Sequence, residues 1–134
     1  MTVEALAGDG YRLEFDEQPP LLTVRLLGDA ETTLERTREY WLRIAERANA
    51  CGAGQLLVLD ALPGEVMSDE DLLRFFDSVG TLGLEHVRIA YVEGRIDQVS
   101  RIEYVELLAL ERGYRIRMFG NESDARLWLR YGGD

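Results

Sequence analysis

Residues 56–59 constrain the fold of this chain more than any other stretch. They read Leu-Leu-Val-Leu, follow Gln55 and end at Asp60. A short, uninterrupted apolar run of this kind is typical of a strand that is buried on both faces. A Pro-Gly pair at 63–64 then breaks regular structure, and a helical pattern of apolar residues begins after Ser68. A doubly buried strand followed by a helix predicts an α/β domain with parallel strands.

Strand and helix patterns alternate along the rest of the chain. Apolar and charged residues alternate over 11–16, and a short turn leads to an apolar stretch at 21–27, so these two strands are expected to pair antiparallel. Further strands are predicted at 55–60, 87–92 and 114–118, the last as an edge strand with one wet face. Helices are predicted at 32–50, 68–82, 100–112 and 122–131.

These patterns predict a single domain over residues 1–134, with a core at about 10–131. The element order is β-β-α-β-α-β-α-β-α. It corresponds to a five-stranded, mixed and mostly parallel sheet with four helices, because strands that are joined by helices run parallel.

A capping residue followed three positions later by an acid precedes each predicted helix. The pairs are Thr32 with Glu35, Ser68 with Asp71, Ser100 with Glu103, and Asn121 with Asp124. The capping oxygen can accept a hydrogen bond from an N–H of the first turn, and the acid favours the positive end of the helix dipole. These pairs support the four helix starts independently of the apolar pattern.

The formal net charge of −10 comes from the first three quarters of the chain. Residues 1–100 hold 19 acidic and 9 basic side chains, whereas residues 101–134 hold six of each. Nucleic acids and anionic membrane surfaces attract positive charge, so neither is an expected partner. No apolar run approaches the length of a membrane-spanning helix, and no basic and apolar signal segment is present. We therefore expect a cytoplasmic protein without membrane insertion.

Several catalytic chemistries are excluded by residues that the chain lacks. All 15 basic residues are arginines, so no lysine is available for a phosphate-binding loop or a Schiff base. Cys51 and His86 are the only residues of their kinds, which excludes a thiolate zinc site and a histidine-rich metal site. No Gly-x-Ser-x-Gly turn displays a nucleophilic serine. We expect a protein that is not an enzyme and that holds no metal or cofactor.

The order of elements, and the segment from Leu56 to Asp60 followed by Met67-Ser68-Asp69, resemble the SpoIIAA-like fold. That superfamily contains the anti-sigma-factor antagonists and the sulfate-transporter-associated (STAS) domains. Its stand-alone bacterial branch lies near the CRAL-TRIO lipid-binding group. The resemblance covers about residues 10–131. It implies a non-catalytic regulatory module that binds a protein partner through the loop and helix start at 60–72.

In the antagonist branch, a kinase phosphorylates a serine of an Asp-Ser-Ser-Gly-like motif at this helix start. Only Ser68 matches that motif, because the second serine and the glycine are absent and three acids follow at 69–71. The resemblance makes Ser68 a candidate phosphosite, with Asp60 and Asp69 as further partner-binding residues. A phosphate there would be favoured by the helix N-terminus but repelled by the acids. The simpler interpretation of Ser68 is a helix cap.

Other functions stay open. The kinship with CRAL-TRIO proteins implies a small-molecule or lipid-binding domain, whose apolar pocket would lie under helix 68–82 and be lined by Leu72, Phe75 and Phe76. The strand-end carboxylates Asp60 and Glu93 would allow acid–base catalysis if they converged.

The predicted helix 100–112 is a further candidate surface. It is apolar around more of its circumference than one sheet face requires. Either the helix is deeply buried, or its additional apolar stripe contacts a protein partner or a second copy of the chain in a homodimer.

Overall fold

Six strands and four helices lie in the part of the chain that the computed structural model describes, and strand and helix alternate after the third strand. That part is residues 2–8, 10–29, 33–63, 67–80, 82–93 and 99–132, without the side chains of 2, 3, 99, 100 and 102. The strands are β1 (Thr2–Gly8), β2 (Tyr11–Gln18), β3 (Leu21–Gly28), β4 (Gln55–Asp60), β5 (Arg88–Glu93) and β6 (Arg115–Phe119). The helices are α1 (Leu34–Ala50), α2 (Asp69–Val79), α3 (Val99–Glu111) and α4 (Glu122–Tyr131).

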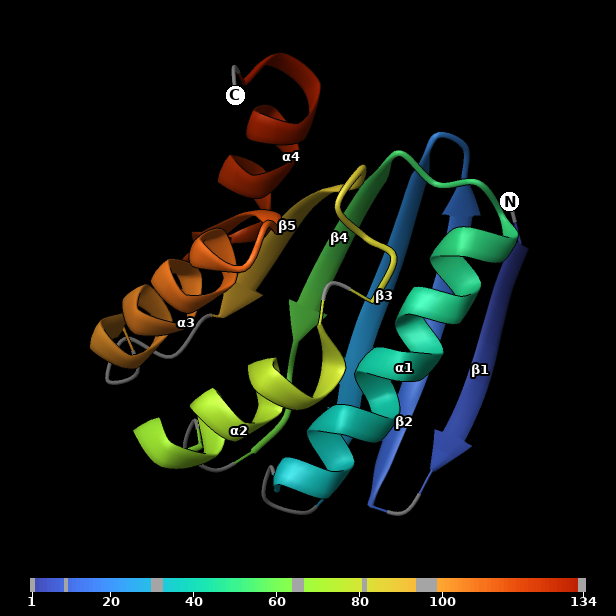
Figure 1. Cartoon of the computed structure of the whole chain (residues 1–134). Coiled ribbons are helices and arrows are strands. Elements are labelled where there is room, and N and C mark those ends of the chain that lie inside the picture. The colour runs from blue at the N-terminus through green and yellow to red at the C-terminus, as the bar shows by residue number, and fades with distance from the viewer. Residues whose placement is uncertain are drawn as a thin grey trace.

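The described strands form one sheet in the order β1-β2-β3-β4-β5-β6 (Figure 1). The pairs β1–β2 and β2–β3 are antiparallel, whereas β3, β4, β5 and β6 pair parallel. The predicted α/β fold with four helices and a mixed sheet is confirmed, and β6 lies at the predicted edge. The prediction of five strands is wrong, because β1 adds a sixth. The prediction of a mostly parallel sheet is also wrong for the first half of the sheet, where two antiparallel pairings precede the first parallel one.

β1 was missed because its pairing does not depend on an apolar face. Glu4, Leu6 and Gly8 are the residues that pair with buried positions of β2, so a charge and a glycine interrupt any apolar period of two. Backbone pairing holds the strand, together with Arg47 of α1, whose Nη2 lies 2.5 Å from Glu4 Oε2. An edge strand that is attached in this way has no distinctive hydrophobic pattern.

The helices divide unequally between the two faces of the sheet. α1, α2 and α3 cover the face on which Leu56, Val58 and Ile89 lie, which we call the three-helix face (Figure 1). α4 covers the opposite face, which contains Leu57 and Leu59 and which we call the α4 face. Crossovers between parallel strands are right-handed, so three crossovers that step in one direction across the sheet place their helices on one face. α4 follows the last strand and folds back over the other face.

The predicted caps of α2 and α4 are confirmed. The Ser68 hydroxyl oxygen accepts a hydrogen bond from the N–H of Asp71 at 3.2 Å. Asn121 Oδ1 accepts one from the N–H of Asp124 at 2.9 Å. Each cap satisfies an N–H that has no partner within its own helix.

The other two predicted caps are wrong. α1 is capped by Thr33, whose Oγ1 accepts from the N–H of Arg36 at 3.2 Å, and the predicted Thr32 lies outside the described residues. Adjacent threonines carry the same capping group, so the sequence does not distinguish them. α3 begins at Val99, and Ser100 therefore lies inside the helix.

The helix predicted at 68–82 is shorter than expected. Gly80, with φ of 61°, ends α2 after Val79. Leu82 and Gly83 then follow in the left-handed region, with φ of 57° and 71°. Leu82 continues the apolar period in the sequence but belongs to the turn, and this explains the overlong prediction.

Arg88 of β5 fixes the C-terminal end of α4. Its guanidinium donates to the carbonyl oxygens of Trp128, Leu129 and Gly132 at 3.0, 3.3 and 3.1 Å. Its Cζ also lies 4.4 Å from the centroid of the Trp128 ring. The last carbonyl groups of a helix lack intrahelical partners. Arg88 adds donors from the sheet to those of Gly132 N–H, which bonds Trp128 O, and of the Gln55 side chain, which bonds Leu129 O, and so holds α4 against the sheet.

Candidate functional site

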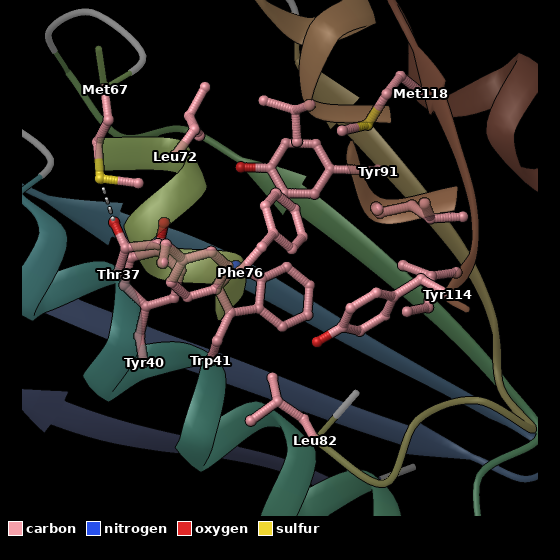
Figure 2. A pocket seen from close by; sticks show the side chains of 15 residues that line it. Thr37, Tyr40, Trp41, Met67, Leu72, Phe76, Leu82, Tyr91, Tyr114 and Met118 are labelled. Atoms are coloured by element: carbon pink, nitrogen blue, oxygen red, sulfur yellow. Dashed lines mark hydrogen bonds between the residues drawn. The ribbon is translucent and has the colours of Figure 1, made fainter. Parts of the chain in front are cut away.

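An apolar cavity of about 80 Å³ lies between the three-helix face and α1, α2 and α3 (Figure 2). Six of the side chains around it are aromatic: Tyr40, Trp41, Phe75, Phe76, Tyr91 and Tyr114. Two more are the methionines Met67 and Met118. A concave, mostly apolar and aromatic wall is typical of small-molecule sites.

Two helices supply the same pattern of side chains to this wall. α1 contributes Thr37, Tyr40 and Trp41, and α2 contributes Leu72, Phe75 and Phe76. In each helix the three residues follow the spacing i, i+3 and i+4, which places them on one helix face. α3 adds Val105 and Ala109, which are four residues apart. The stripe that directs each helix toward the sheet is therefore also the stripe that lines the cavity.

The aromatic rings pack against one another around the cavity. Trp41 of α1 stacks on Tyr91 of β5, with ring centroids 6.4 Å apart and planes inclined by 22°. Phe76 meets Phe75 and Tyr114 edge-to-face, at 5.2 and 6.0 Å. Such pairs stabilise each other beyond the area that they bury. The wall is therefore built from rigid, mutually supported rings.

A hydrogen bond ties the aromatic wall to the carboxyl end of β4. The Tyr91 hydroxyl donates to Asp60 Oδ2 at 2.5 Å, while Asp60 Oδ1 accepts from the N–H of Leu62 at 2.9 Å. Burial raises the pKa of Tyr91 well above its ordinary value, and the negative charge of Asp60 raises it further. Burial and Asp60 also raise the pKa of Tyr40. Both phenols therefore keep their protons at neutral pH.

Two further hydroxyl groups of the wall also donate to protein atoms. Tyr114 donates to the carbonyl oxygen of Gly80 at 2.5 Å, and Thr37 donates to the sulfur of Met67 at 3.7 Å. Burial is the main cause that raises the pKa of Tyr114 to about 12, with a contribution from the charge of Glu85. The Tyr114 hydroxyl thus remains a donor to the end of α2.

Arg101 of α3 connects that helix to the start of α2. It forms an ion pair with Asp69 and donates to the carbonyl oxygen of Met67. Met67 itself lines the cavity. This contact closes one end of the space between α2 and α3.

The structure separates the predicted site residues into two groups. Leu72, Phe75 and Phe76 are buried and line the cavity. Ser68 and Asp69 are exposed at the start of α2 and do not line it. Asp60, which was grouped with Ser68 in the prediction, instead contacts the cavity wall through Tyr91.

The two strand-end carboxylates are neighbours. Asp60 and Glu93 pair in register on β4 and β5, and Glu93 is only 5% exposed. Both oxygens of Asp60 accept hydrogen bonds from the protein. The structure therefore uses Asp60 to hold Tyr91 and the turn after β4.

The sequence analysis did not predict several residues of the cavity wall as site residues. Tyr40, Trp41 and Tyr91 belong to elements that were predicted, and Trp41 was already part of the apolar stripe of its helix. The i, i+3, i+4 pattern that α1 shares with α2 was the available signal. The contact of Tyr91 with Asp60 depends on the relative register of two strands, which no local pattern specifies.

The additional apolar stripe of α3 is partly exposed. Leu108 and Ala109 are buried, whereas Leu107 and Leu110 are 52% and 50% exposed. Deep burial therefore accounts for only part of the helix. The exposed leucines form a small apolar surface on its outer side.

The described residues contain neither a candidate metal cluster nor a candidate membrane-spanning helix. Among them, no cluster of three or more histidine, cysteine or acidic side chains is placed to hold a metal ion. No helix in the described segments is long and apolar enough to cross a membrane.

No family model and no curated protein matches this chain. Membership of the SpoIIAA-like superfamily stays a prediction from element order and from the segment around Ser68.

Proposed function

We propose that this protein binds a small apolar molecule in the cavity between the three-helix face and α1, α2 and α3. The observation that carries this proposal is the aromatic and methionine wall around a space that the core leaves unfilled. The predicted pocket residues Leu72, Phe75 and Phe76 belong to that wall.

The energetic cost of the cavity supports a binding role. At about 24 cal/mol per Å³, a cavity of about 80 Å³ costs about 2 kcal/mol relative to a filled core. Natural domains are stable by only about 5–15 kcal/mol. A ligand that fills the space would recover part of that energy as affinity.

The volume limits the size of the ligand. The cavity exceeds the ~10–15 Å³ that one water molecule requires but is about half of the ~150 Å³ of an apolar cavity that binds benzene. Met67 and Met118 have three rotatable bonds each and can change shape at low cost. We therefore propose a ligand about the size of one ring, which enters as the methionine side chains rearrange.

Methyl NMR tests this function. The methionine methyl signals of Met67 and Met118 are followed while benzene is added to the wild type and to Ala109→Val. The wild type should show saturable shifts of both signals. The valine occupies the cavity, so the same titration of the variant should leave them unchanged. Signals that do not move in the folded wild type would contradict the proposal.

A second proposal is the regulatory module that binds a protein partner through residues 60–72. It is supported by the exposure of Ser68 and Asp69 at the start of α2 and by the exposed leucines Leu107 and Leu110 of α3, which would suit a partner or a second copy of the chain.

The second proposal is tested by affinity purification from the host with Ser68→Asp. Aspartate also caps helices, so this variant changes charge and leaves the cap in place. A protein partner that is retained by the wild type should be lost with Ser68→Asp. It should be kept with Ser123→Asp, a matched change in the first turn of α4. Equal recovery with both variants would contradict the role of residues 60–72.

A further inference from the structure

Three of the four hydroxyl-bearing side chains around the otherwise apolar cavity donate their protons to protein atoms. Tyr91 donates its proton to Asp60 at 2.5 Å, Tyr114 to Gly80 at 2.5 Å, and Thr37 to Met67 at 3.7 Å. Each of these protons points to a protein acceptor. What a phenol then presents to a ligand is the lone pairs of its oxygen, and these accept hydrogen bonds.

Tyr91 is the strongest of these acceptors. A hydroxyl that donates to a charged carboxylate is polarised, and chains of hydrogen bonds strengthen one another in a medium of low dielectric constant. The partner of Tyr114 is a neutral carbonyl, and that of Thr37 is a thioether, which is a weak acceptor. Figure 2 shows the Tyr91 ring and its hydroxyl among the side chains that surround the cavity.

The same geometry disfavours anions. The carboxylate of Asp60 lies directly behind the Tyr91 hydroxyl, and Glu93 is its buried neighbour in register. None of the described residues that line the cavity is an arginine. An anionic ligand would lose its hydration without gaining a compensating charge.

We propose that the ligand is a small, neutral aromatic molecule with one O–H or N–H group that donates to the Tyr91 hydroxyl oxygen. This inference rests on the proposed function and specifies its ligand. The stacked rings of Trp41 and Tyr91 offer an aromatic surface beside that acceptor. The free carboxylate of a fatty acid is excluded from the same position.

Three ring compounds of similar size test the proposal by calorimetry: phenol, anisole and benzoate. Anisole keeps the ring and the oxygen but cannot donate. One net hydrogen bond is worth about 1 kcal/mol, or about fivefold in affinity, so phenol should bind about fivefold more tightly than anisole. Benzoate should not bind measurably. Equal affinities for phenol and anisole, or a preference for benzoate, would overturn the assignment of the ligand class.

Two variants locate the acceptor. Tyr91→Phe should remove the preference for phenol and leave the affinity for anisole within about twofold. Tyr114→Phe should keep the preference for phenol. A preference for phenol that persists in Tyr91→Phe, or that is lost only in Tyr114→Phe, would overturn the role of Tyr91. If Tyr91→Phe does not fold, the ratio of the phenol affinity to the anisole affinity, measured in the wild type and in Tyr114→Phe, still tests whether the ligand donates to an acceptor other than Tyr114. Failure of all three probes and of benzene to bind the wild type would instead remove the proposed function itself.

Discussion

The two faces of the sheet bury neighbouring residues of the same strands in different ways. On the α4 face, Leu57, Leu59, Ala90 and Val92 of the strands pack against a single helix, whose end is held by Arg88. On the three-helix face, aromatic rings from α1, α2 and β5, together with Tyr114 just before β6, meet around a cavity. The aromatic cavity belongs to the three-helix face, whereas the α4 face has an open, partly polar hollow at its margin, beside Leu21, Gln55 and Arg126.

The contacts on the α4 face stabilise the fold, whereas the cavity on the three-helix face is the proposed binding site. Under α4, apolar contacts, carbonyl hydrogen bonds and a cation–π contact act together at one helix end. Over the three-helix face, rigid rings support one another but leave a space that costs stability. Added side-chain volume should therefore cost more stability on the α4 face than beside the cavity.

The largest expected effect is alkaline destabilisation of the three-helix face. Burial raises the pKa of Tyr11 and Tyr114 to about 12, and it raises the pKa of Tyr40 and Tyr91 as well. In the unfolded chain these phenols lose their protons near pH 10. Between that value and the raised values the folded state holds more protons, so the free energy of unfolding should fall as the pH rises from about 10 to about 12.

Urea unfolding at a series of pH values measures this fall. Tyr114→Phe removes one of the titrating groups and should make the fall less steep. A free energy of unfolding that stays constant over this range of pH, or the same slope in Tyr114→Phe, would contradict burial as the cause.

The next effect concerns the attachment of α4. Arg88→Ala removes three charge-assisted hydrogen bonds and the contact over Trp128. It should lower the free energy of unfolding by about 3 kcal/mol, because three contacts of a charged donor are lost, while Trp128 O keeps the N–H of Gly132 and Leu129 O keeps the side chain of Gln55. Arg126→Ala on the same helix breaks only an exposed ion pair with Glu122 and should cost less than about 1 kcal/mol. Equal losses in urea unfolding would show that Arg88 does not hold the helix.

A matched pair of alanines compares the packing of the two faces. Ala109 of α3 lines the cavity and is 1% exposed, and Ala125 of α4 belongs to the buried cluster of the other face and is 0% exposed. Valine has the same cost in helix propensity at both sites. Ala125→Val should destabilise by about 1–3 kcal/mol through overpacking, whereas Ala109→Val should fill space and lose less than about 1 kcal/mol. Thermal unfolding that ranks the two variants the other way would contradict the difference between the faces.

The smallest effect concerns the turn beside the cavity. Leu82 has φ of 57°, which a bulky residue rarely adopts, and its side chain lines the cavity. Leu82→Ala loses packing and keeps the strain, whereas Leu82→Gly loses packing but relieves the strain. The glycine variant should therefore be the more stable of the two by about 1 kcal/mol. A more stable alanine variant in urea unfolding would mean that the backbone conformation is not strained.

The sequence was sufficient for features that depend on local periodicity and caps. Each of these features is specified within a few residues: the stripe of Leu72, Phe75 and Phe76, the caps at Ser68 and Asn121, and the apolar run at 56–59. The prediction of a pocket under helix 68–82 came instead from the resemblance to the CRAL-TRIO group.

The remaining features depend on how distant segments meet. The bond from Tyr91 to Asp60 requires the register of β4 against β5. The attachment of β1 depends on Arg47, which lies 43 positions from Glu4 in the chain. The contact of Arg101 with Asp69 joins two helices in the same way. Such contacts follow from tertiary structure, and no local pattern contains them.

The most direct test of the central claim uses the two tryptophans of the chain. Trp41 lines the cavity, whereas Trp128 packs under Arg88 on the α4 face. Their indole N–H signals are recorded by NMR while benzene is added to the wild type. A saturable shift of the Trp41 signal with an unchanged Trp128 signal is the predicted result. A Trp41 signal that stays in place, or a larger shift at Trp128, would contradict binding in the cavity.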